Sequence, residues 1–242
     1  PQNPKTPIWI IKNLNRRKKM LFRVARSLHT RAASAVGIFG GSFDPPHRAH
    51  VALVETAIAQ LQLDRVQVLP TGQAWHKPRQ LSDAADRLAM TRLAFEHLPR
   101  VAVDDREILR IGPSYTIDTL EALMAEQAGS VLFLVIGGDQ LAAFNQWRRW
   151  QDILKIATVC VAQRLPQRGK SAHPVDRPSA LPDFLPLEFP AMPVSATEIR
   201  LRLAAQGREP GSVPADLQGL IPQDVAAYIS QHMLYQSNPI IP

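Results

Sequence analysis

The sequence predicts an α/β protein with a doubly wound, mostly parallel Rossmann-like sheet and a C-terminal helical portion. From residue 35 onward, short apolar runs alternate with segments of helical pattern. The apolar runs are continuous and do not alternate with polar residues, which is typical of parallel strands covered by helices on both faces. The length of 242 residues is also sufficient for a substantial buried core.

Five apolar runs are expected to form the strands: Ala35–Gly40, Arg65–Leu69, Arg100–Val103, Val131–Ile136 and Thr158–Gln163. Three segments between them are expected to be helical: Ala49–Gln62, Asp83–Leu98 and Tyr115–Gln127. Right-handed crossovers would join the parallel strands of such a sheet. Ligands bind where the strand order of such a sheet reverses, which we expect at the carboxyl ends of the first and fourth strands.

The C-terminal part begins with a proline-rich segment, residues 165–186, which holds five prolines and is expected to be a long loop. Ser195 and Glu198 have the spacing of a capping box, which predicts a helix to about Ala205. A last helix is expected from Pro222 to His232, with Val225, Tyr228 and Ile229 facing inward. We therefore expect one domain over residues 35–236 and a frayed tail over 237–242.

The positive charge of the chain lies in its first 34 residues, which hold nine Lys and Arg and no Asp or Glu. The rest of the chain has 19 basic and 21 acidic residues, so its net charge is slightly negative. Residues 1–34 are expected to be a disordered basic extension. Two alternatives stay open for this extension. It could contact nucleic acid or an anionic membrane, or it could be an organelle transit peptide.

Composition excludes some functions. The longest apolar runs, such as Val131–Ile136, are too short to span a membrane. Cys160 is the single cysteine and has no partner for an internal disulfide, which fits a cytoplasmic protein. The slightly acidic body argues against nucleic acid as the main partner, and a homo-oligomer is compatible with the sequence.

Residues 37–50, Gly-Ile-Phe-Gly-Gly-Ser-Phe-Asp-Pro-Pro-His-Arg-Ala-His, form the most informative segment of the chain. An apolar strand leads into glycines and then into the start of a helix. Glycines allow a phosphate to approach the backbone, and the N–H groups of the first helical turn point toward it. His47 and His50, three residues apart, would share one helix face. The expected ligand is a nucleotide polyphosphate.

The segment from Gly40 to His50 resembles the signature of the HxGH nucleotidyltransferase superfamily, with Ala49 in place of its usual glycine. A second signature of that superfamily is similar to Val194-Ser-Ala-Thr-Glu-Ile-Arg200. Four other stretches resemble bacterial nicotinate-nucleotide adenylyltransferases, and the likeness covers about residues 35–236. They are Trp75-His76-Lys77-Pro78, Pro113-Ser-Tyr-Thr-Ile-Asp-Thr-Leu120, Ile136-Gly-Gly-Asp139 and Phe144-Asn-Gln-Trp147.

The resemblance implies a nucleotidyltransferase-type fold in which the two signatures hold one ATP triphosphate between them. It implies catalytic roles for His47, His50 and Arg200, which would stabilise charge on the phosphates. The residues expected to bind ATP are Gly40, Gly41, Ser42, Phe43, His47, His50, Asp139, Arg164, Ser195, Thr197 and Arg200. The residues alone leave other interpretations open. His47 and His50 could be a zinc site or a surface pair of histidines, Asp139 could simply cap a helix, and Ser195 could belong to an ordinary capping box. Asp44 is expected to hold the turn.

By the same resemblance, nicotinate mononucleotide would contact His76, Lys77, Ser114, Tyr115, Thr116 and Trp147. An electron-poor nicotinate ring would stack on the Trp147 indole, and the helix that opens at Ser114–Thr116 could receive its carboxylate. Trp147 as a plain core aromatic stays open as an alternative, although Trp150 is the better core candidate.

The implied reaction joins ATP and nicotinate mononucleotide to give nicotinate adenine dinucleotide and pyrophosphate, a step in NAD synthesis. The phosphate of the mononucleotide would attack the α-phosphorus in line, without a covalent intermediate. Mg²⁺ is expected to accompany ATP, with no metal site in the protein itself. The alternatives are a sibling adenylyltransferase acting on nicotinamide mononucleotide, pantetheine phosphate or another acceptor, and a nucleic-acid-binding module guided by the basic extension.

Overall fold

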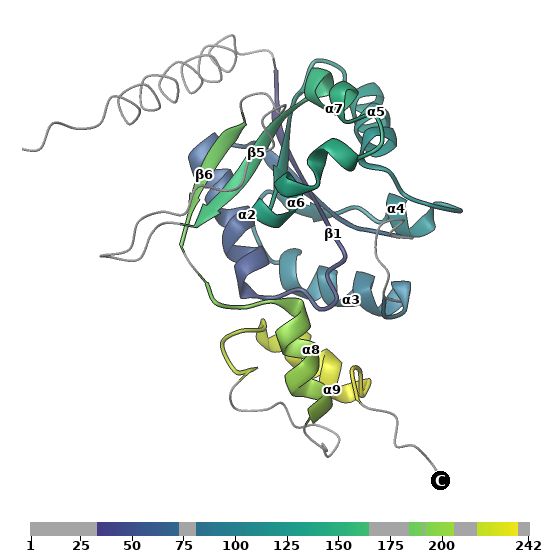
Figure 1. The fold of residues 1–242 in the computed structure, drawn as a ribbon, viewed down its shortest axis with the longest axis vertical. Coiled ribbons are helices and arrows are strands. Elements are labelled where there is room, and N and C mark those ends of the chain that lie inside the picture. Colours follow the sequence, from purple (N-terminus) through teal and green to yellow (C-terminus); the bar gives the residue numbers. More distant parts are fainter. Residues whose placement is uncertain (1–32, 73–80, 165–183, 191, 206–216, 237–242) are drawn as a thin grey trace, which may run out of the picture.

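The computed structural model of the protein describes residues 33–72, 81–164, 184–190, 192–205 and 217–236 (Figure 1). Almost all of the expected basic extension, most of the proline-rich segment and the expected tail over 237–242 therefore lie outside the described residues. No helix in the described part of the chain is long and apolar enough to cross a membrane.

The centre of the molecule is a six-stranded sheet in the order β3-β2-β1-β4-β5-β6, in which every pair of neighbours is parallel. Its strands are β1 (Ala35–Gly41), β2 (Arg65–Pro70), β3 (Val101–Val103), β4 (Val131–Ile136), β5 (Ala157–Arg164) and β6 (Leu185–Phe189). The order reverses between β1 and β4, which confirms the doubly wound sheet and the expected position of its switch point. The five expected strands all occur, with ends within one residue of the expected ones.

Helices follow the strands in the expected alternation, and two more close the chain. They are α2 (Arg48–Leu61), α3 (Ala84–Phe95), α4 (Arg106–Leu109), α5 (Thr116–Glu126), α6 (Gly138–Ala142), the 3-10 helix η1 (Phe144–Gln146), α7 (Trp150–Ile156), α8 (Ala196–Ala205) and α9 (Gln223–Gln231). The expected helices correspond to α2, α3, α5, α8 and α9. The short helices α4, α6, η1 and α7 were not expected, because too few turns are present for an apolar period to show.

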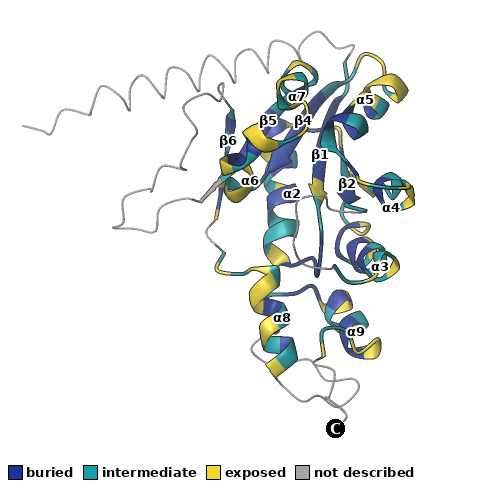
Figure 2. Cartoon of the chain, turned by 45° about the vertical axis from the view of Figure 1, so that its right-hand side comes forward, coloured by how far each residue is buried: buried dark blue, intermediate teal, exposed yellow. Residues whose placement is uncertain are grey.

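Both faces of the sheet are buried, as the continuous apolar strands predicted (Figure 2). In β4, residues Leu132–Ile136 are at most 4 % exposed, and they alternate between two apolar cores. One core contains side chains of α2, α3, α8 and α9, and the other contains side chains of α5, α6 and α7. A Cβ on Gly37 would lie only 2.7 Å from Leu63, so glycine lets the segment that follows α2 pack tightly on β1.

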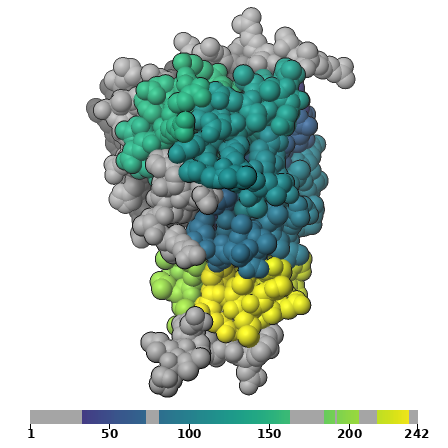
Figure 3. Space-filling view, turned by 90° about the vertical axis from the view of Figure 1, so that its right-hand side faces the viewer, coloured from purple at the N-terminus to yellow at the C-terminus, as the bar shows by residue number. Residues whose placement is uncertain are grey.

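Strand β6 corrects the expectation that residues 165–186 are a loop throughout, because Leu185 and Pro186 already belong to this edge strand. The proline in this strand, Pro186, discouraged a strand assignment, but proline is tolerated at a sheet edge. From β6 the chain passes to α8 and α9, which lie side by side below the sheet in Figures 1 and 2. Figure 3 shows the last described segment against the α3 region, where the Tyr228 hydroxyl donates to Asp86 at 2.9 Å.

Candidate active site

The turn after β1 is built around the buried ring of Phe43. This residue has φ of +45° and is 1 % exposed, with its ring 5.5 Å from that of Phe39 and 5.2 Å from that of His50. A Cβ on Gly41 would lie 2.9 Å from the Phe43 ring, so this position needs glycine. Phe43 therefore supports the turn and His50 from inside the core, and only its backbone is available to the expected nucleotide.

The two histidines at the start of α2 stack on each other, with ring centroids 3.7 Å apart and an angle of 16° between the planes. His47 is the N-cap residue of α2, and its backbone N–H donates to Nδ1 of His50 at 3.2 Å. Because Nδ1 of His50 accepts this bond, the neutral ring of His50 carries its proton on Nε2. His47 is 6 % exposed, and burial lowers its pKa to about 4, so its ring is neutral at pH 7.

Arg200 joins the two signatures that are 150 residues apart in the sequence. Its Nη1 donates to the backbone oxygen of Asp44 at 2.6 Å, and its Nη2 donates to the Thr197 hydroxyl at 3.0 Å. The expectation that the Ser42–His50 and Ser195–Arg200 segments lie together is therefore confirmed. Their meeting point is the loop that follows β1, at the switch point of the sheet.

Ser195 caps α8 as expected, because its hydroxyl accepts the backbone N–H of Glu198 at 3.2 Å. The Glu198 carboxylate does not complete a reciprocal capping box within the described structure but accepts from Arg202 at 2.7 Å. The cap thus orients the first turn of α8, from which Thr197 reaches Arg200.

Asp44 holds the turn, as expected from the sequence. The residue is 1 % exposed, and its carboxylate accepts the Tyr235 hydroxyl at 2.7 Å and the Ser82 backbone N–H at 3.3 Å. The end of the described chain and the start of α3 are therefore both fastened to the β1 loop.

Arg87 on α3 is a site-building residue that sequence reasoning missed. It is 2 % exposed, and its guanidinium donates to the backbone oxygens of Ser42, Thr71, Gly72 and Ser82. The loops after β1 and β2 are thereby tied to one buried side chain. The only signal in the sequence was an arginine within the weak apolar stripe of α3, which is the same signal that a surface arginine gives.

The start of α5 lies against the end of β2. A Cβ on Gly72 would overlap the Glu107 backbone oxygen, and this oxygen also accepts the hydroxyl of buried Ser114 at 3.2 Å. The Ser114 hydroxyl thus has an internal role in joining α4 to α5. Tyr115 is the N-cap residue of α5 and Thr116 its first residue, so the expected helix opening at Ser114–Thr116 is confirmed.

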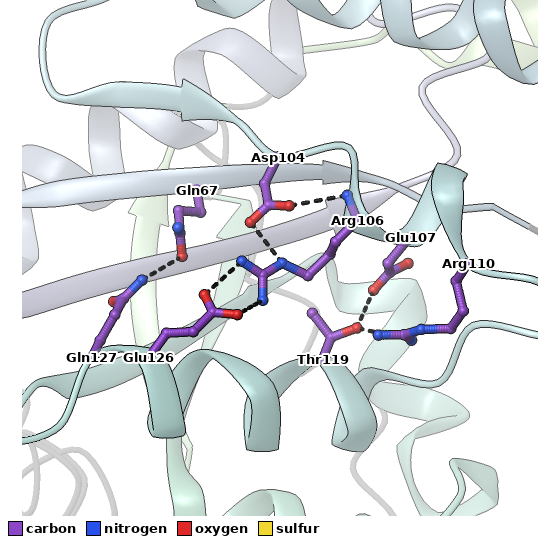
Figure 4. A network of polar contacts seen from close by, with 8 residues as sticks. All are labelled: Gln67, Asp104, Arg106, Glu107, Arg110, Thr119, Glu126 and Gln127. Carbon is purple, nitrogen blue, oxygen red and sulfur yellow. Dashed lines mark hydrogen bonds and ion pairs between the residues drawn. The ribbon is translucent and has the colours of Figure 1, made fainter.

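Polar contacts hold α4 against α5, as Figure 4 shows. Arg106 donates to Asp104 at 2.8 Å and forms a two-pronged pair with Glu126 at 2.9 Å. Glu107 is buried and accepts the Thr119 hydroxyl at 2.8 Å, and burial raises the pKa of its carboxyl group. This network fixes the backbone that carries Ser114 and Tyr115.

Trp147 directly follows η1, is half-buried, and has its ring 5.2 Å from that of Phe144. Trp150 is likewise half-buried, with its ring 6.3 Å from that of Phe144, and both indoles pack against the same apolar core. Arg148, which sequence reasoning missed, places its guanidinium carbon 4.5 Å from the centre of the Tyr115 ring. This contact brings the Trp147 segment next to the start of α5.

The other expected site residues are placed only in part. Asp139 is exposed in the first turn of α6, directly after β4. Arg164 is the last residue of β5, and its side chain lies outside the described part of the structure. His76 and Lys77 also lie outside the described residues, in the segment that leaves β2 beyond Gly72.

The fold and the joined signatures define a nucleotidyltransferase-type protein, and comparison with known proteins agrees. Residues 38–202 match the family model described as cytidylyltransferase-like. A probable nicotinate-nucleotide adenylyltransferase of Albidiferax ferrireducens is 47 % identical over 202 residues, which cover 84 % of this chain and 98 % of the relative. One from Bordetella avium is 41 % identical over 204 residues, with 83 % and 98 % covered. The chain therefore belongs to the cytidylyltransferase-like family and, within it, to the nicotinate-nucleotide adenylyltransferases.

Solved structures support the same fold at low sequence identity. The nicotinic acid mononucleotide adenylyltransferase of Plasmodium falciparum, solved with NaAD, superposes with a TM-score of 0.64 at 16 % identity. The match covers 84 % of this chain and 97 % of that one. A protein of Vibrio parahaemolyticus that is assigned as a nicotinate-nucleotide adenylyltransferase superposes with a TM-score of 0.57 at 18 % identity. That match covers 85 % of this chain and 97 % of the other.

Proposed function

We propose that the protein transfers the adenylyl group of ATP to nicotinate mononucleotide, which yields nicotinate adenine dinucleotide and pyrophosphate. The observation that carries this proposal is the contact of Arg200 with the Asp44 backbone, which places two phosphate-binding signatures at the switch point of the sheet. Relatives that match over nearly their whole length and are named for this reaction support it.

The triphosphate of ATP would lie between the β1 loop and the start of α8. There it would meet the Nε2–H of His50 and the Arg200 guanidinium. Since burial keeps the pKa of His47 at about 4, this ring would take part as a neutral donor and as the stacking support of His50.

The acceptor would be held between the start of α5 and Trp147, with its phosphate toward the α-phosphorus of ATP. A phosphate oxygen of the mononucleotide forms the new bond to that phosphorus, and the bond from it to the bridging oxygen of the β-phosphate breaks. The electron pair leaves with pyrophosphate, so no protein nucleophile is needed. The residues contribute alignment and stabilisation of the charge that develops on the leaving oxygen.

Mg²⁺ would be bound mainly by the substrate. Within the described ranges, no group of three or more His, Cys, Asp and Glu side chains could hold a metal ion. Phosphate oxygens and water are the ligands that Mg²⁺ prefers at nucleotide sites, where it neutralises phosphate charge. Asp139, exposed at the start of α6 beside the switch point, is the side chain that could contact a water of such an ion.

A panel of acceptors tests the proposed function. ATP and Mg²⁺ are combined with nicotinate mononucleotide, nicotinamide mononucleotide or pantetheine phosphate, and pyrophosphate release is measured against a reaction without acceptor. We expect the highest kcat/KM with nicotinate mononucleotide and formation of the dinucleotide. Turnover confined to pantetheine phosphate would reject the proposal, and a clear preference for nicotinamide mononucleotide would reassign the enzyme to the sibling activity.

A further inference from the structure

Two neighbouring arginines after Trp147 have contrasting surroundings. Arg149 is neutralised by two carboxylates, because it pairs with Glu121 at 2.7 Å and with Asp152 at 2.9 Å. Arg148 forms no ion pair with any of the described residues, and its guanidinium lies over the face of the Tyr115 ring. The chain therefore holds one arginine in an ion-pair cluster and presents the next one as a positive charge without an acidic partner in the described structure.

Contact with Tyr115 places this charge at the expected mononucleotide site. Tyr115 is the N-cap residue of α5, and Trp147, the neighbour of Arg148, carries the indole on which the pyridine ring is proposed to stack. A cation over an aromatic face is attracted by it, which limits the conformations of the exposed arginine before any ligand binds. Less ordering is then needed when a carboxylate binds to its guanidinium.

We propose that Arg148 is a specificity-determining residue that pairs with the carboxylate of the nicotinate ring and so selects the acid over the amide. This inference rests on the proposed function. Nicotinate carries a carboxylate and nicotinamide an uncharged amide on otherwise equal rings, so a charge-based contact discriminates between them directly. Arginine suits this task because its guanidinium is always charged and matches a carboxylate with two parallel N–H bonds.

Exposure of Arg148 limits the size of this effect. Water and salt screen an exposed ion pair, whereas a pair made in a ligand-filled site is screened less. We expect Arg148 to contribute about tenfold to the ratio of kcat/KM for the acid to kcat/KM for the amide, equivalent to about 1.4 kcal/mol.

The test compares Arg148→Gln, Arg148→Lys and the matched control Arg149→Gln with the unaltered protein. Values of kcat/KM are measured for nicotinate and nicotinamide mononucleotides at saturating ATP and Mg²⁺. Arg148→Gln should raise KM for the acid, leave kcat/KM for the amide unchanged, and lower the acid-to-amide ratio about tenfold. Arg148→Lys should give an intermediate ratio, and Arg149→Gln the ratio of the unaltered protein.

Ionic strength provides a second measurement. As salt rises from about 0.01 to 1 M, the Debye length falls from about 30 to 3 Å, so the ratio of the unaltered protein should fall while that of Arg148→Gln stays level. An unchanged ratio in Arg148→Gln, or an equal loss of kcat/KM with both acceptors, overturns the inference while the proposed function stands. Failure of the unaltered protein to use nicotinate mononucleotide would instead overturn the proposed function.

Discussion

Replacement of Arg87 by methionine tests whether one buried side chain holds the loops after β1 and β2 in place. The guanidinium donates to four backbone oxygens, at 3.1 Å to Ser82, 3.2 Å to Ser42 and 3.3 Å to Gly72, with Thr71 as the fourth. Methionine fills much of the same volume but leaves these carbonyl groups without their donor.

The expected loss of stability follows from these bonds. A hydrogen bond to a charged group contributes about 1.5–3 kcal/mol, but the burial of the guanidinium offsets part of the sum. A buried carbonyl group left without its donor costs about 1–3 kcal/mol, and two of the bonds here are long, so we expect a total loss of about 3 kcal/mol. For a chain of this size, about 3 kcal/mol lowers Tm by roughly 6–12 °C.

Urea denaturation followed by circular dichroism measures the free energy of unfolding. Steady-state kinetics measures KM for the two substrates, which reports on the position of the loops. Arg87→Met should also raise KM for both ATP and the mononucleotide, because the loops after β1 and β2 both lose an anchor. Arg87→Lys should recover part of each loss, since an ammonium group reaches fewer carbonyls than a guanidinium.

The matched control is Arg92→Met on the same helix. The Arg92 side chain is 46 % exposed and forms surface pairs with Glu96 and Asp105, so its loss should change stability by no more than about 1 kcal/mol. If Arg87→Met destabilised the protein no more than Arg92→Met, or left both KM values unchanged, the argument for Arg87 would be refuted.

Three further predictions concern the proposed site. His50→Ala should keep the fold and lower kcat by at least about a hundredfold, whereas His97→Ala, at an exposed histidine, should not; near-normal turnover of the first variant would remove the role. Trp147→Ala should mainly raise KM for the mononucleotide, and an unchanged KM would contradict ring stacking. The folded protein holds the pKa of His47 at about 4, below the ordinary value of 6.5. Between pH 6.5 and pH 4, the His47 ring is therefore protonated in the unfolded chain but not in the folded protein. Stability of the substrate-free protein should therefore fall by about 3 kcal/mol as pH drops from 6.5 to 4, and urea titrations should show a flatter profile for His47→Gln; equal profiles would disprove the assignment.

Local sequence predicted much of the site because its chemistry depends on short segments. Glycines, a buried strand and a helix start are contiguous between Gly37 and His50, and the cap at Ser195 needs only the next turn of α8. The edge strand β6 was missed in part because proline in Leu185–Phe189 is compatible with both a loop and a sheet edge. Roles in substrate binding, a homo-oligomeric state and cytoplasmic location stay predictions.

By itself the sequence determined the class of fold, the switch point and the two signature segments, because apolar periodicity and turn chemistry are properties of neighbouring residues. Only the tertiary structure decided that Arg87 is buried among backbone carbonyls, that Tyr235 binds Asp44 and that Arg148 lies on Tyr115. In each of these contacts the chain folds back so that side chains meet groups distant in sequence. The position of an arginine or tyrosine in the sequence does not show which backbone or ring it will reach, because the packing of the helices on the sheet sets those distances.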